Sequence, residues 1–516
     1  MKTKYLIAFF ACFSMGSTTW ADTNKLKINQ YLDFERVSNP QISPDGKEII
    51  YTRTYIDKLK DNFASTQWVM DSDGNKNRRL LEGSNVEWSP DGTRIAYVSD
   101  ADEDGSEIFV RWMDAEGATS QITHFEFSPN SLKWSPDGKW IAFKARVPYK
   151  SDWTIDMPSP PKGAQWTGPA RVVERQDYKQ DRVGALTGND HLFVVSSDGG
   201  TPRQITTGDW NVGYSFSGAR SGAEYDWSPD STTLIFDGFM GIIDPTYHSP
   251  SQIYKVDITT KEVTQLTKKQ GTWSTPSISP NGKTIAFYGQ IEIGGSHRTP
   301  DIRTISIDGE NEQVLIVDPP STPGKMNWDK NNRYVYFNMS VEGSTNVYKM
   351  DLKGNISPVT KGEQRIGISS ISEGGIAAVT YTNPFETGVI SIVKLSSGKL
   401  ENLVNVNDDV LEGITLGTVE EIRYNAPDGQ AVHGWMMYPP DFDSSKKYPM
   451  ILAIHGGPHG DYGNNFSFTF QEMAANGNII LYTNPRGSTS YGAAFAQAIH
   501  NQYPGPLDYQ DLMAGV

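Results

Sequence analysis

The stretch Trp88-Ser89-Pro90-Asp91-Gly92-Thr93-Arg94-Ile95-Ala96-Tyr97-Val98 decides the fold, because it is one of several copies of a single pattern. Ser-Pro-Asp-Gly is a turn sequence in which proline presets φ at the second position, aspartate tolerates the third, and glycine closes the reversal. The β-rich run at 95–98 has the alternation of a half-buried strand. The pattern therefore predicts a β-hairpin.

The same turn recurs along most of the chain. Its other copies are Ser43-Pro44-Asp45-Gly46, Ser135-Pro136-Asp137-Gly138, Ser228-Pro229-Asp230-Ser231 and Ser279-Pro280-Asn281-Gly282. The anchors before the turns and one later tryptophan are spaced by 46, 46, 93, 51 and 50 residues, and they are Ile42, Trp88, Trp134, Trp227, Ile278 and Trp328. Periods of roughly 40–50 residues with four strands each are typical of propeller blades.

The 93-residue step fits either two blades or one blade with an insert. Residues 149–190 are rich in proline, glycine and charge and contain no second turn phrase, which favours the insert. Short fourth strands give an independent count of seven, and they lie at 79–81, 121–123, 204–206, 265–267, 313–315, 358–360 and 402–404. The sequence thus predicts an all-β, seven-bladed propeller over residues 22–407, with the recurring tryptophans packed between blades.

A second type of domain begins near residue 417. Strands are expected at 420–424 and 431–438 around the turn Pro427-Asp428-Gly429, and an apolar strand at 450–454. A helix at 466–476, closed by Gly477, and a strand at 478–483 follow. Apolar strands that alternate with helices indicate a parallel sheet covered on both faces. Residues 417–516 are therefore expected to be the N-terminal part of an α/β-hydrolase domain.

The expected strand at 450–454 runs into His455-Gly456-Gly457-Pro458. A glycine loop in this position supplies an oxyanion-hole N–H in serine hydrolases. The 516 residues contain no Gly-x-Ser-x-Gly elbow, and the nearest match, at 213–217, has serine in place of the second glycine. Ser488 and Ser490 do not sit in an elbow either. We therefore expect the chain to be truncated before its catalytic serine and inactive as it stands.

The N-terminus has the order of an export signal. Lys2 and Lys4 precede the apolar run 5–13, and a small, polar stretch closes at Ala21. Nine apolar residues are too few to span a bilayer. Cleavage after Ala21 would remove Cys12, the only cysteine, and change the formal charge from −15 to −17. The chain is expected to be exported, to the periplasm, with no disulfide and no nucleic-acid partner.

In combination, the repeated turns and the hydrolase phrases resemble the prolyl oligopeptidase family of serine peptidases, in its acylaminoacyl peptidase and bacterial dipeptidyl peptidase branch. The phrases are 455–458, Asn484-Pro485-Arg486-Gly487-Ser488 with Tyr491-Gly492, and 508–512. The resemblance implies a propeller that caps an α/β-hydrolase, short peptides as substrates, Ser-His-Asp acyl transfer, and no metal or organic cofactor. In that family the Ser, Asp and His of the triad follow the segment that matches 508–516. None of these three residues can therefore be placed on this chain.

The resemblance also implies roles for individual residues. Gly457 would be an oxyanion-hole donor, and His455, Gly456, Arg486 and Tyr491 would belong to active-site loops. Arg486 would order these loops through hydrogen bonds or be an ordinary structural or solvated arginine.

In the insert, Glu174 would bind the α-ammonium group of a substrate or belong to a solvated charged loop. The choice between dipeptidyl, acylaminoacyl and endo-oligopeptidase activity stays open, as do the P1 preference and the oligomeric state. A non-catalytic periplasmic propeller that binds a partner is the alternative function.

Overall fold

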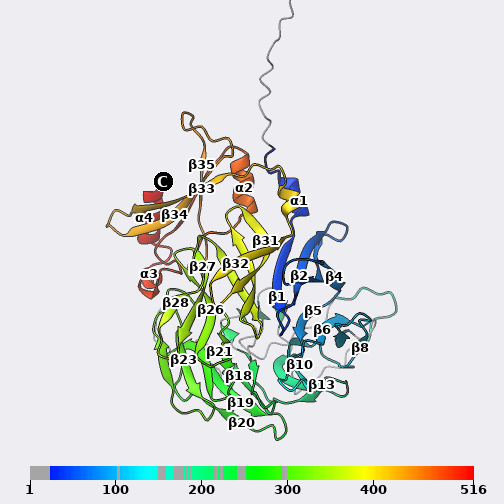
Figure 1. Ribbon diagram of the computed structural model, residues 1–516. Helices are drawn as coiled ribbons and strands as arrows, with labels where there is room; N and C mark the ends of the chain where they lie inside the picture. The colour runs from blue at the N-terminus through cyan, green and yellow to red at the C-terminus, as the bar shows by residue number, and fades with distance from the viewer. Residues whose placement is uncertain are drawn as a thin grey trace, which may run out of the picture.

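A ring of antiparallel strand groups lies below a smaller mixed sheet in the computed structural model (Figure 1). The structure describes residues 24–101, 105–148, 158–167, 179–180, 184–185, 188–213, 215–216, 219–220, 225–240, 251–291, 297 and 299–516. Glu174 and the expected signal sequence lie outside these residues.

The described strands of the ring form seven groups of four, taken here in chain order. Group 1 contains β1 (Arg36–Ile42), β2 (Glu48–Asp57), β3 (Asn62–Asp71) and β4 (Arg78–Leu81). Group 2 contains β5 (Ser84–Trp88), β6 (Arg94–Asp100), β7 (Ser106–Trp112) and β8 (Thr119–Gln121). Group 3 contains β9 (Asn130–Trp134), β10 (Trp140–Pro148), β13 (Gly188–Ser196) and β14 (Arg203–Gln204). Group 4 contains β17 (Tyr225–Trp227), β18 (Thr233–Gly238), β19 (Gln252–Asp257) and β20 (Val263–Gln265).

The last three groups continue the order. Group 5 contains β21 (Thr272–Ile278), β22 (Thr284–Gln290), β23 (Asp301–Ser306) and β24 (Gln313–Ile316). Group 6 contains β25 (Asn327–Trp328), β26 (Tyr334–Val341), β27 (Ser344–Asp351) and β28 (Ile356–Pro358). Group 7 contains β29 (Arg365–Ile371), β30 (Ile376–Asn383), β31 (Glu386–Lys394) and β32 (Lys399–Asn405), and one parallel pairing joins it to group 6. Two short ribbons pair β11 (Lys179–Gln180) with β12 (Gly184–Ala185) and β15 (Ser215–Phe216) with β16 (Ala219–Arg220).

The Ser-Pro-Asp-Gly turns join the first two strands of five groups, so the predicted hairpins are confirmed. In group 2 the Ser89 hydroxyl donates to Asp91 at 2.6 Å and accepts from the Arg94 N–H at 2.9 Å. Gly92 closes the turn at φ +70°, where a side chain is disfavoured. The same serine-to-aspartate or serine-to-asparagine bond recurs in the other four turns.

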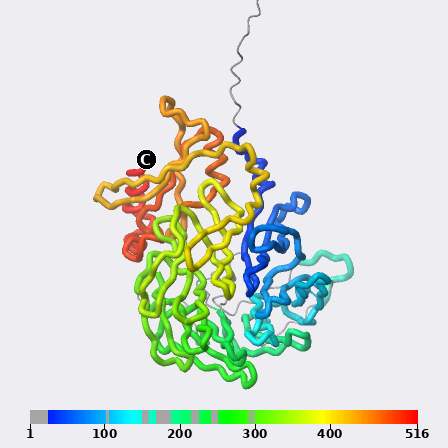
Figure 2. The backbone as a smooth tube through the Cα atoms, in the orientation of Figure 1, coloured from blue at the N-terminus to red at the C-terminus, as the bar shows by residue number. Residues whose placement is uncertain are grey.

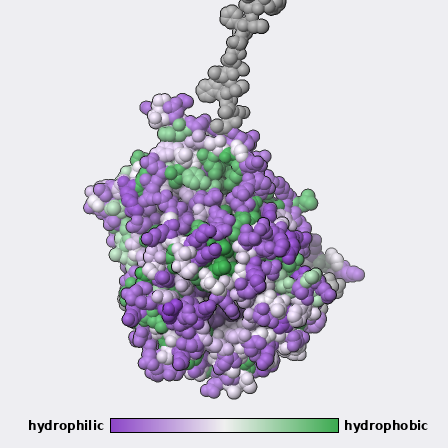
Figure 3. Space-filling view, viewed as in Figure 1, coloured by the Kyte–Doolittle hydropathy of each residue, from purple (hydrophilic) through white to green (hydrophobic). Residues whose placement is uncertain are grey.

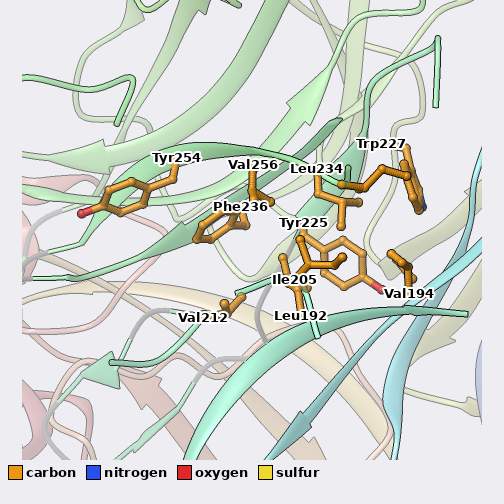
Figure 4. Packing of buried hydrophobic residues seen from close by; sticks show 12 residues of the cluster. Leu192, Val194, Ile205, Val212, Tyr225, Trp227, Leu234, Phe236, Tyr254 and Val256 are labelled. Atoms are coloured by element: carbon orange, nitrogen blue, oxygen red, sulfur yellow. The ribbon is translucent and has the colours of Figure 1, made fainter. Parts of the chain in front are cut away.

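Hydrophobic clusters lie between consecutive groups and hold the ring together. Figure 4 shows one of them, in which Leu192 and Val194 of group 3 lie close to Leu234 and Phe236 of group 4. Five further clusters join the other consecutive groups. The seventh joins group 1 to group 7, through Tyr51 among others. Packing rather than strand pairing therefore joins the first group to the last.

The recurring tryptophans serve this packing. The Trp88 indole N–H of group 2 donates to the Gln41 carbonyl of group 1 at 3.0 Å. The corresponding indoles of groups 3, 4 and 6 make the same contact with the preceding group. Each indole thus satisfies its polar atom while its rings fill the seam, as expected for a buried tryptophan.

A single group occupies the 93-residue step of the repeat. β10 pairs directly with β13 from Trp140–Ser196 to Pro148–Gly188. Residues 149–187 therefore lie between the second and third strands of group 3. The segment ends at residue 187, three residues before the boundary expected from composition.

The upper sheet has the order β33 (Thr418–Asn425), β34 (Ala431–Tyr438), β36 (Ile479–Asn484) and β35 (Met450–Ala453). The expectation of a parallel sheet is wrong for two of the three pairings, since only β35 and β36 run parallel. The short turn after β33 forces β34 to run antiparallel to it, whereas α2 (Phe468–Ala475) provides the crossover that parallel pairing needs. The helix begins two residues later than expected, because the Ser467 hydroxyl caps it by accepting from the Phe470 N–H.

Helices cover both faces of this sheet. α2 packs on Trp435, Met437 and Tyr482. Tyr424 pairs with Val432, which lies on the face of β34 opposite to Trp435. On that face the Tyr424 hydroxyl donates to the Asp511 carbonyl of α4 (Pro506–Gly515) at 2.9 Å. The remaining helices are α3 (Ala493–Gln497), α1 (Asp408–Leu411) and the 3₁₀ helix η1 (Ile28–Asp33).

The first described residues run beside the link between the ring and the upper sheet. In Figure 2 the dark blue start of the chain lies next to the yellow segment near residue 410, and the Thr415 N–H donates to the Asn24 carbonyl. Tyr31 of η1 packs edge-on against Phe468 of α2, with ring centroids 5.2 Å apart. Figure 3 shows hydrophobic residues gathered over the region of β33 and α2 on an otherwise mostly hydrophilic face.

Candidate active site

Two loops meet at the carboxyl ends of the parallel strands β35 and β36. The first loop, residues 455–461, follows β35, and the second loop, residues 485–491, follows β36. The Thr489 N–H donates to the Gly460 carbonyl at 2.9 Å, and the His459 Nδ1 lies 2.9 Å from the Gly487 carbonyl. These bonds fix the two loops to each other. The carboxyl end of parallel strands is where α/β sheets place their ligands.

Gly457 has the features required of a free hydrogen-bond donor. It is exposed, and its N–H makes no hydrogen bond to any residue that the structure describes. Its φ is +138°, and a β-carbon there would lie 2.8 Å from the His459 nitrogen. No atom lies within 4 Å of the corresponding β-carbon position at Gly456. The backbone between the two loops is therefore open, as an approaching oxyanion would need.

His455 joins the first loop to the second. Its Nε2 lies 2.9 Å from the Ser488 hydroxyl, and that hydroxyl donates to the Pro485 carbonyl at 2.6 Å. Since the hydroxyl has only one proton, we assign the His455 proton to Nε2. Burial lowers the pKa of His455, which favours this neutral form. Ser488 is fully buried, and its proton is donated to a carbonyl instead of to a base that could activate the oxygen for attack.

Ser490 is also buried and serves a contact with the ring. Its carbonyl accepts from the Glu342 N–H at 3.0 Å, and its hydroxyl lies 3.4 Å from the Gly343 nitrogen. Asp461, at the end of the first loop, lies 3.5 Å from the same hydroxyl and pairs with Arg365 of β29 at 2.7 Å. The ring thus borders the candidate site at Ser490 and Asp461.

Asn484, at the end of β36, ties together segments that are distant in sequence. It is fully buried, its carbonyl oxygen accepts from the Tyr462 N–H at 2.8 Å, and its amide donates to the Tyr462 carbonyl at 3.0 Å. The amide also donates to the Tyr491 hydroxyl at 2.8 Å. That hydroxyl in turn lies 2.7 Å from the His433 Nδ1. Tyr491 therefore holds the second loop on β34, rather than pointing into open space.

Arg486 is a buried structural arginine. Its side chain bonds both oxygens of Asp511, at 3.0 and 2.7 Å, and its backbone N–H bonds Asp511 at 2.8 Å. A further bond to Asp428 reaches the turn between β33 and β34 at 2.5 Å. These carboxylates raise the pKa of Arg486 above its ordinary value. Of the two roles left open by the sequence, the solvated arginine is wrong: Arg486 fastens the start of the second loop to α4.

The structure places five of the predicted site residues on these two joined loops and adds others that the sequence did not single out. His455, Gly456 and Gly457 share the first loop, and Arg486 and Tyr491 stand at the two ends of the second. The residues that sequence reasoning missed are Asn484, Asp461, His433 and Gly343. Asn484 lay within a quoted phrase, but its partners are 7 to 51 residues away and leave no local signal. Glu174 cannot be related to these loops because it lies outside the described residues.

Among the described residues there is no cluster of three or more histidine, cysteine, aspartate or glutamate side chains suited to a metal ion. Nor does any described helix have the length and apolar character needed to cross a membrane.

Lowering the pH from 7.5 to 5.5 is expected to lower the melting temperature. Burial depresses the pKa of four described histidines below the ordinary value of about 6.5, and these are His191, His297, His433 and His455. As the pH falls below that value, these histidines are protonated in the unfolded chain but stay neutral in the folded chain. The free energy of unfolding therefore decreases as the pH is lowered. His433→Gln should lessen the pH dependence measured by calorimetry, whereas His500→Gln, at an exposed position, should not. An unchanged pH dependence in His433→Gln would contradict this account.

Two family models match separate parts of the chain. Residues 165–290 match the dipeptidyl peptidase IV N-terminal region, and residues 464–516 match the prolyl oligopeptidase family. An uncharacterized peptidase of Bacillus subtilis, YuxL, is 28% identical over 93% of this chain and 73% of its own length. Dipeptidyl-peptidase 5 of Porphyromonas gingivalis is 25% identical over 97% of this chain and 75% of its own length.

Solved structures share the fold at lower identity. Pyrococcus horikoshii acylaminoacyl peptidase superposes with a TM-score of 0.75 and 19% identity, covering 95% of this chain and 72% of its own. A puromycin-hydrolyzing peptidase of Mycobacterium tuberculosis gives a TM-score of 0.62 and 14% identity, covering 93% of this chain and 70% of its own. Because two models of peptidase families match and peptidase relatives align along almost its entire length, the resemblance of this chain to the prolyl oligopeptidase family is confirmed.

Proposed function

We propose that this chain belongs to an exported serine peptidase that hydrolyses short peptides by Ser-His-Asp acyl transfer. The observation that carries the proposal is the open N–H of Gly457, held in a loop at the end of a parallel strand. A donor fixed before the reaction stabilises the tetrahedral oxyanion by about 3–4 kcal/mol. The bonds to the second loop supply that rigidity.

The ring is proposed to be a seven-bladed propeller over residues 22–407, followed by a peptidase domain over 417–516, with export directed by residues 1–21. The seven clusters between consecutive groups, including the one that joins the first group to the last, support the propeller. A cavity of about 330 Å³ is lined by the first strands of the groups, and Gln41, Glu87 and Lys133 are among its residues. The ring is proposed to restrict access to short peptides.

The nucleophile is not assigned to any residue of 1–516. No Gly-x-Ser-x-Gly elbow occurs in the sequence, and the hydroxyls of Ser488 and Ser490 are buried. We therefore propose that this polypeptide is inactive by itself and uses no metal or organic cofactor. The absence of an elbow equally favours the second candidate, a non-catalytic periplasmic propeller that binds a partner.

Dipeptidyl, acylaminoacyl and oligopeptidase activities share this chemistry and differ in how the substrate's N-terminus is bound. Glu174 is proposed to bind a free α-ammonium group. Equal cleavage of free-N-terminal dipeptides after Glu174→Gln in an active form would refute that role.

Peptide hydrolysis separates the two candidate functions. The 516-residue polypeptide should release no chromophore above background from dipeptidyl, acylaminoacyl or oligopeptide substrates. The same polypeptide extended by the residues encoded after Val516 should be active and sensitive to serine-directed inhibitors. In that form Gly457→Ala keeps the N–H but should displace it, because the β-carbon would lie 2.8 Å from the His459 nitrogen. We expect kcat to fall by about 10²–10³-fold.

Gly374→Ala is the control for a glycine substitution away from the site. Gly374 lies in a turn of the ring, and its added β-carbon would have no atom closer than 3.8 Å. Serine-inhibitor-sensitive turnover by the 516-residue polypeptide would refute the proposal that its nucleophile lies elsewhere. A reading frame that stops at Val516 would favour the binding propeller.

A further inference from the structure

The tip of the β26–β27 hairpin, residues 341–344, reaches from the ring into the upper sheet. The Glu342 N–H donates to the Ser490 carbonyl at 3.0 Å. The Gly343 carbonyl accepts from the Asn464 N–H at 3.0 Å, and the Asn464 amide donates to the Ser344 hydroxyl at 2.8 Å. Backbone bonds between parts so distant in sequence are specific, since each needs a defined partner.

The contact is too close for any residue but glycine. Gly343 is buried at φ +79°, and a β-carbon there would lie 2.5 Å from the Trp435 ring and 3.1 Å from the Gly463 Cα. A β-carbon on Gly463 would lie only 2.0 Å from the Gly343 carbonyl oxygen. The backbones of Gly343 and Gly463 thus contact each other directly beside the Trp435 ring. The hairpin tip can therefore bind in only one position.

Two ion pairs cross the same junction. Glu342 pairs with Arg423 of β33 at 2.7 Å, and Arg365 of β29 pairs with Asp461 at 2.7 Å. Asp461 also accepts from the Thr489 hydroxyl at 3.2 Å. The tip and these pairs therefore act on the ends of both candidate-site loops.

We propose that the hairpin tip 341–344 is a positioning element for the candidate site, with Gly343 as its central positioning residue. The proposal rests on the proposed function, in which Gly457 supplies the oxyanion donor. Ser490 stands one residue from the end of the second loop, and Asn464 follows the first loop closely. Holding both residues fixes the two loops relative to the ring, and with them the position of the Gly457 N–H.

His297, between β22 and β23 of the ring, also stacks on His459 of the first loop with ring centroids 4.8 Å apart. Two other contacts across the junction do not reach these loops. Phe34 stacks on Phe466 with ring centroids 5.6 Å apart, and Lys25 pairs with Asp441 at 2.9 Å. They fasten the ring to α2 and to the segment before β35. Loss of one of them should weaken the junction while leaving the loops in place.

Hydrogen exchange of the full chain, read by mass spectrometry, tests the proposal. Gly343→Ala should speed exchange in peptides covering 455–464 and 485–491 by about tenfold or more, because the tip can no longer seat and its hydrogen bonds open. Peptides from β33 and β34 should stay as protected as before. Asn464→Ala, which leaves the tip itself unchanged, should have the same local effect.

The matched control is Gly375→Ala. This glycine has a similar φ of +75°, but no atom lies within 4 Å of its β-carbon position, so the variant reproduces the backbone strain without the collision. Phe34→Ala is the control for a weakened junction. Unchanged loop exchange in both Gly343→Ala and Asn464→Ala would overturn the proposal, and so would a uniform rise across 418–516. This readout requires no turnover, so a failed peptidase assay with the expected exchange pattern would refute only the proposed function.

Discussion

Asp511→Ala is expected to destabilise the upper sheet by about 3–5 kcal/mol. Asp511 is fully buried, and both of its oxygens accept hydrogen bonds from Arg486. Removing one partner of a buried ion pair leaves the other charge without compensation, which costs more than the pair itself contributes. The start of the second loop would lose its attachment to α4 at the same time, because the Arg486 N–H also bonds Asp511.

Urea unfolding combined with limited proteolysis measures this loss. The variant should be cut within 418–516 at lower urea concentration than the parent chain, while the ring stays resistant. Asp428 is the other partner of Arg486, and the Asp428 side chain is 46% exposed. Asp428→Ala should therefore have a much smaller effect, because water can replace the lost carboxylate. Equal effects of the two substitutions would contradict the assignment of Asp511 as the principal partner.

Trp435→Ala is expected to cost about 3–5 kcal/mol as well, as large-to-small substitutions of buried aromatics do. The Trp435 side chain is 1% exposed and stacks on Tyr482 with ring centroids 5.6 Å apart. The ring centroids of Trp435 and His433 are 4.3 Å apart. Trp435 belongs to the hydrophobic cluster that packs under α2, and its ring also packs against Gly343 of the hairpin tip. Its loss should therefore weaken both the sheet and the junction with the ring.

Thermal unfolding and exchange in β34 and β36 report on this substitution. Trp166→Ala, at a side chain 52% exposed, should leave both unchanged. Trp435→Phe should recover part of the loss, because it restores an aromatic ring to the stack. Similar stability of Trp435→Ala and Trp166→Ala would exclude Trp435 from the core of the sheet.

The strand groups were predictable because their signals are local. A Ser-Pro-Asp-Gly turn contains its own hydrogen bonds, from Ser89 to Asp91 for example, so four residues suffice to define a hairpin. The spacing of the anchors then gives the repeat. The 93-residue step could be interpreted for the same reason, since its middle contains no turn phrase.

The orientation of the upper strands was only partly predictable. Apolar runs alternating with a helix indicated β35 and β36 correctly, but the same apolar character in β34 does not reveal that β36 pairs with it antiparallel. That pairing depends on which edge of β34 is free after the hairpin with β33, and strand order of this kind is a property of the assembled sheet.

The sequence by itself determined the repeated hairpins, the change of strand pattern near residue 417 and the glycine loop at 455–458, because each depends on residues that are neighbours in the chain. Only the tertiary structure decided that His455 bonds Ser488, that Asn484 holds Tyr462 and Tyr491, and that Gly343 seats between Trp435 and Gly463. These contacts join positions 7 to 120 residues apart. Their energies depend on distances and burial that exist only after the ring and the sheet have packed together.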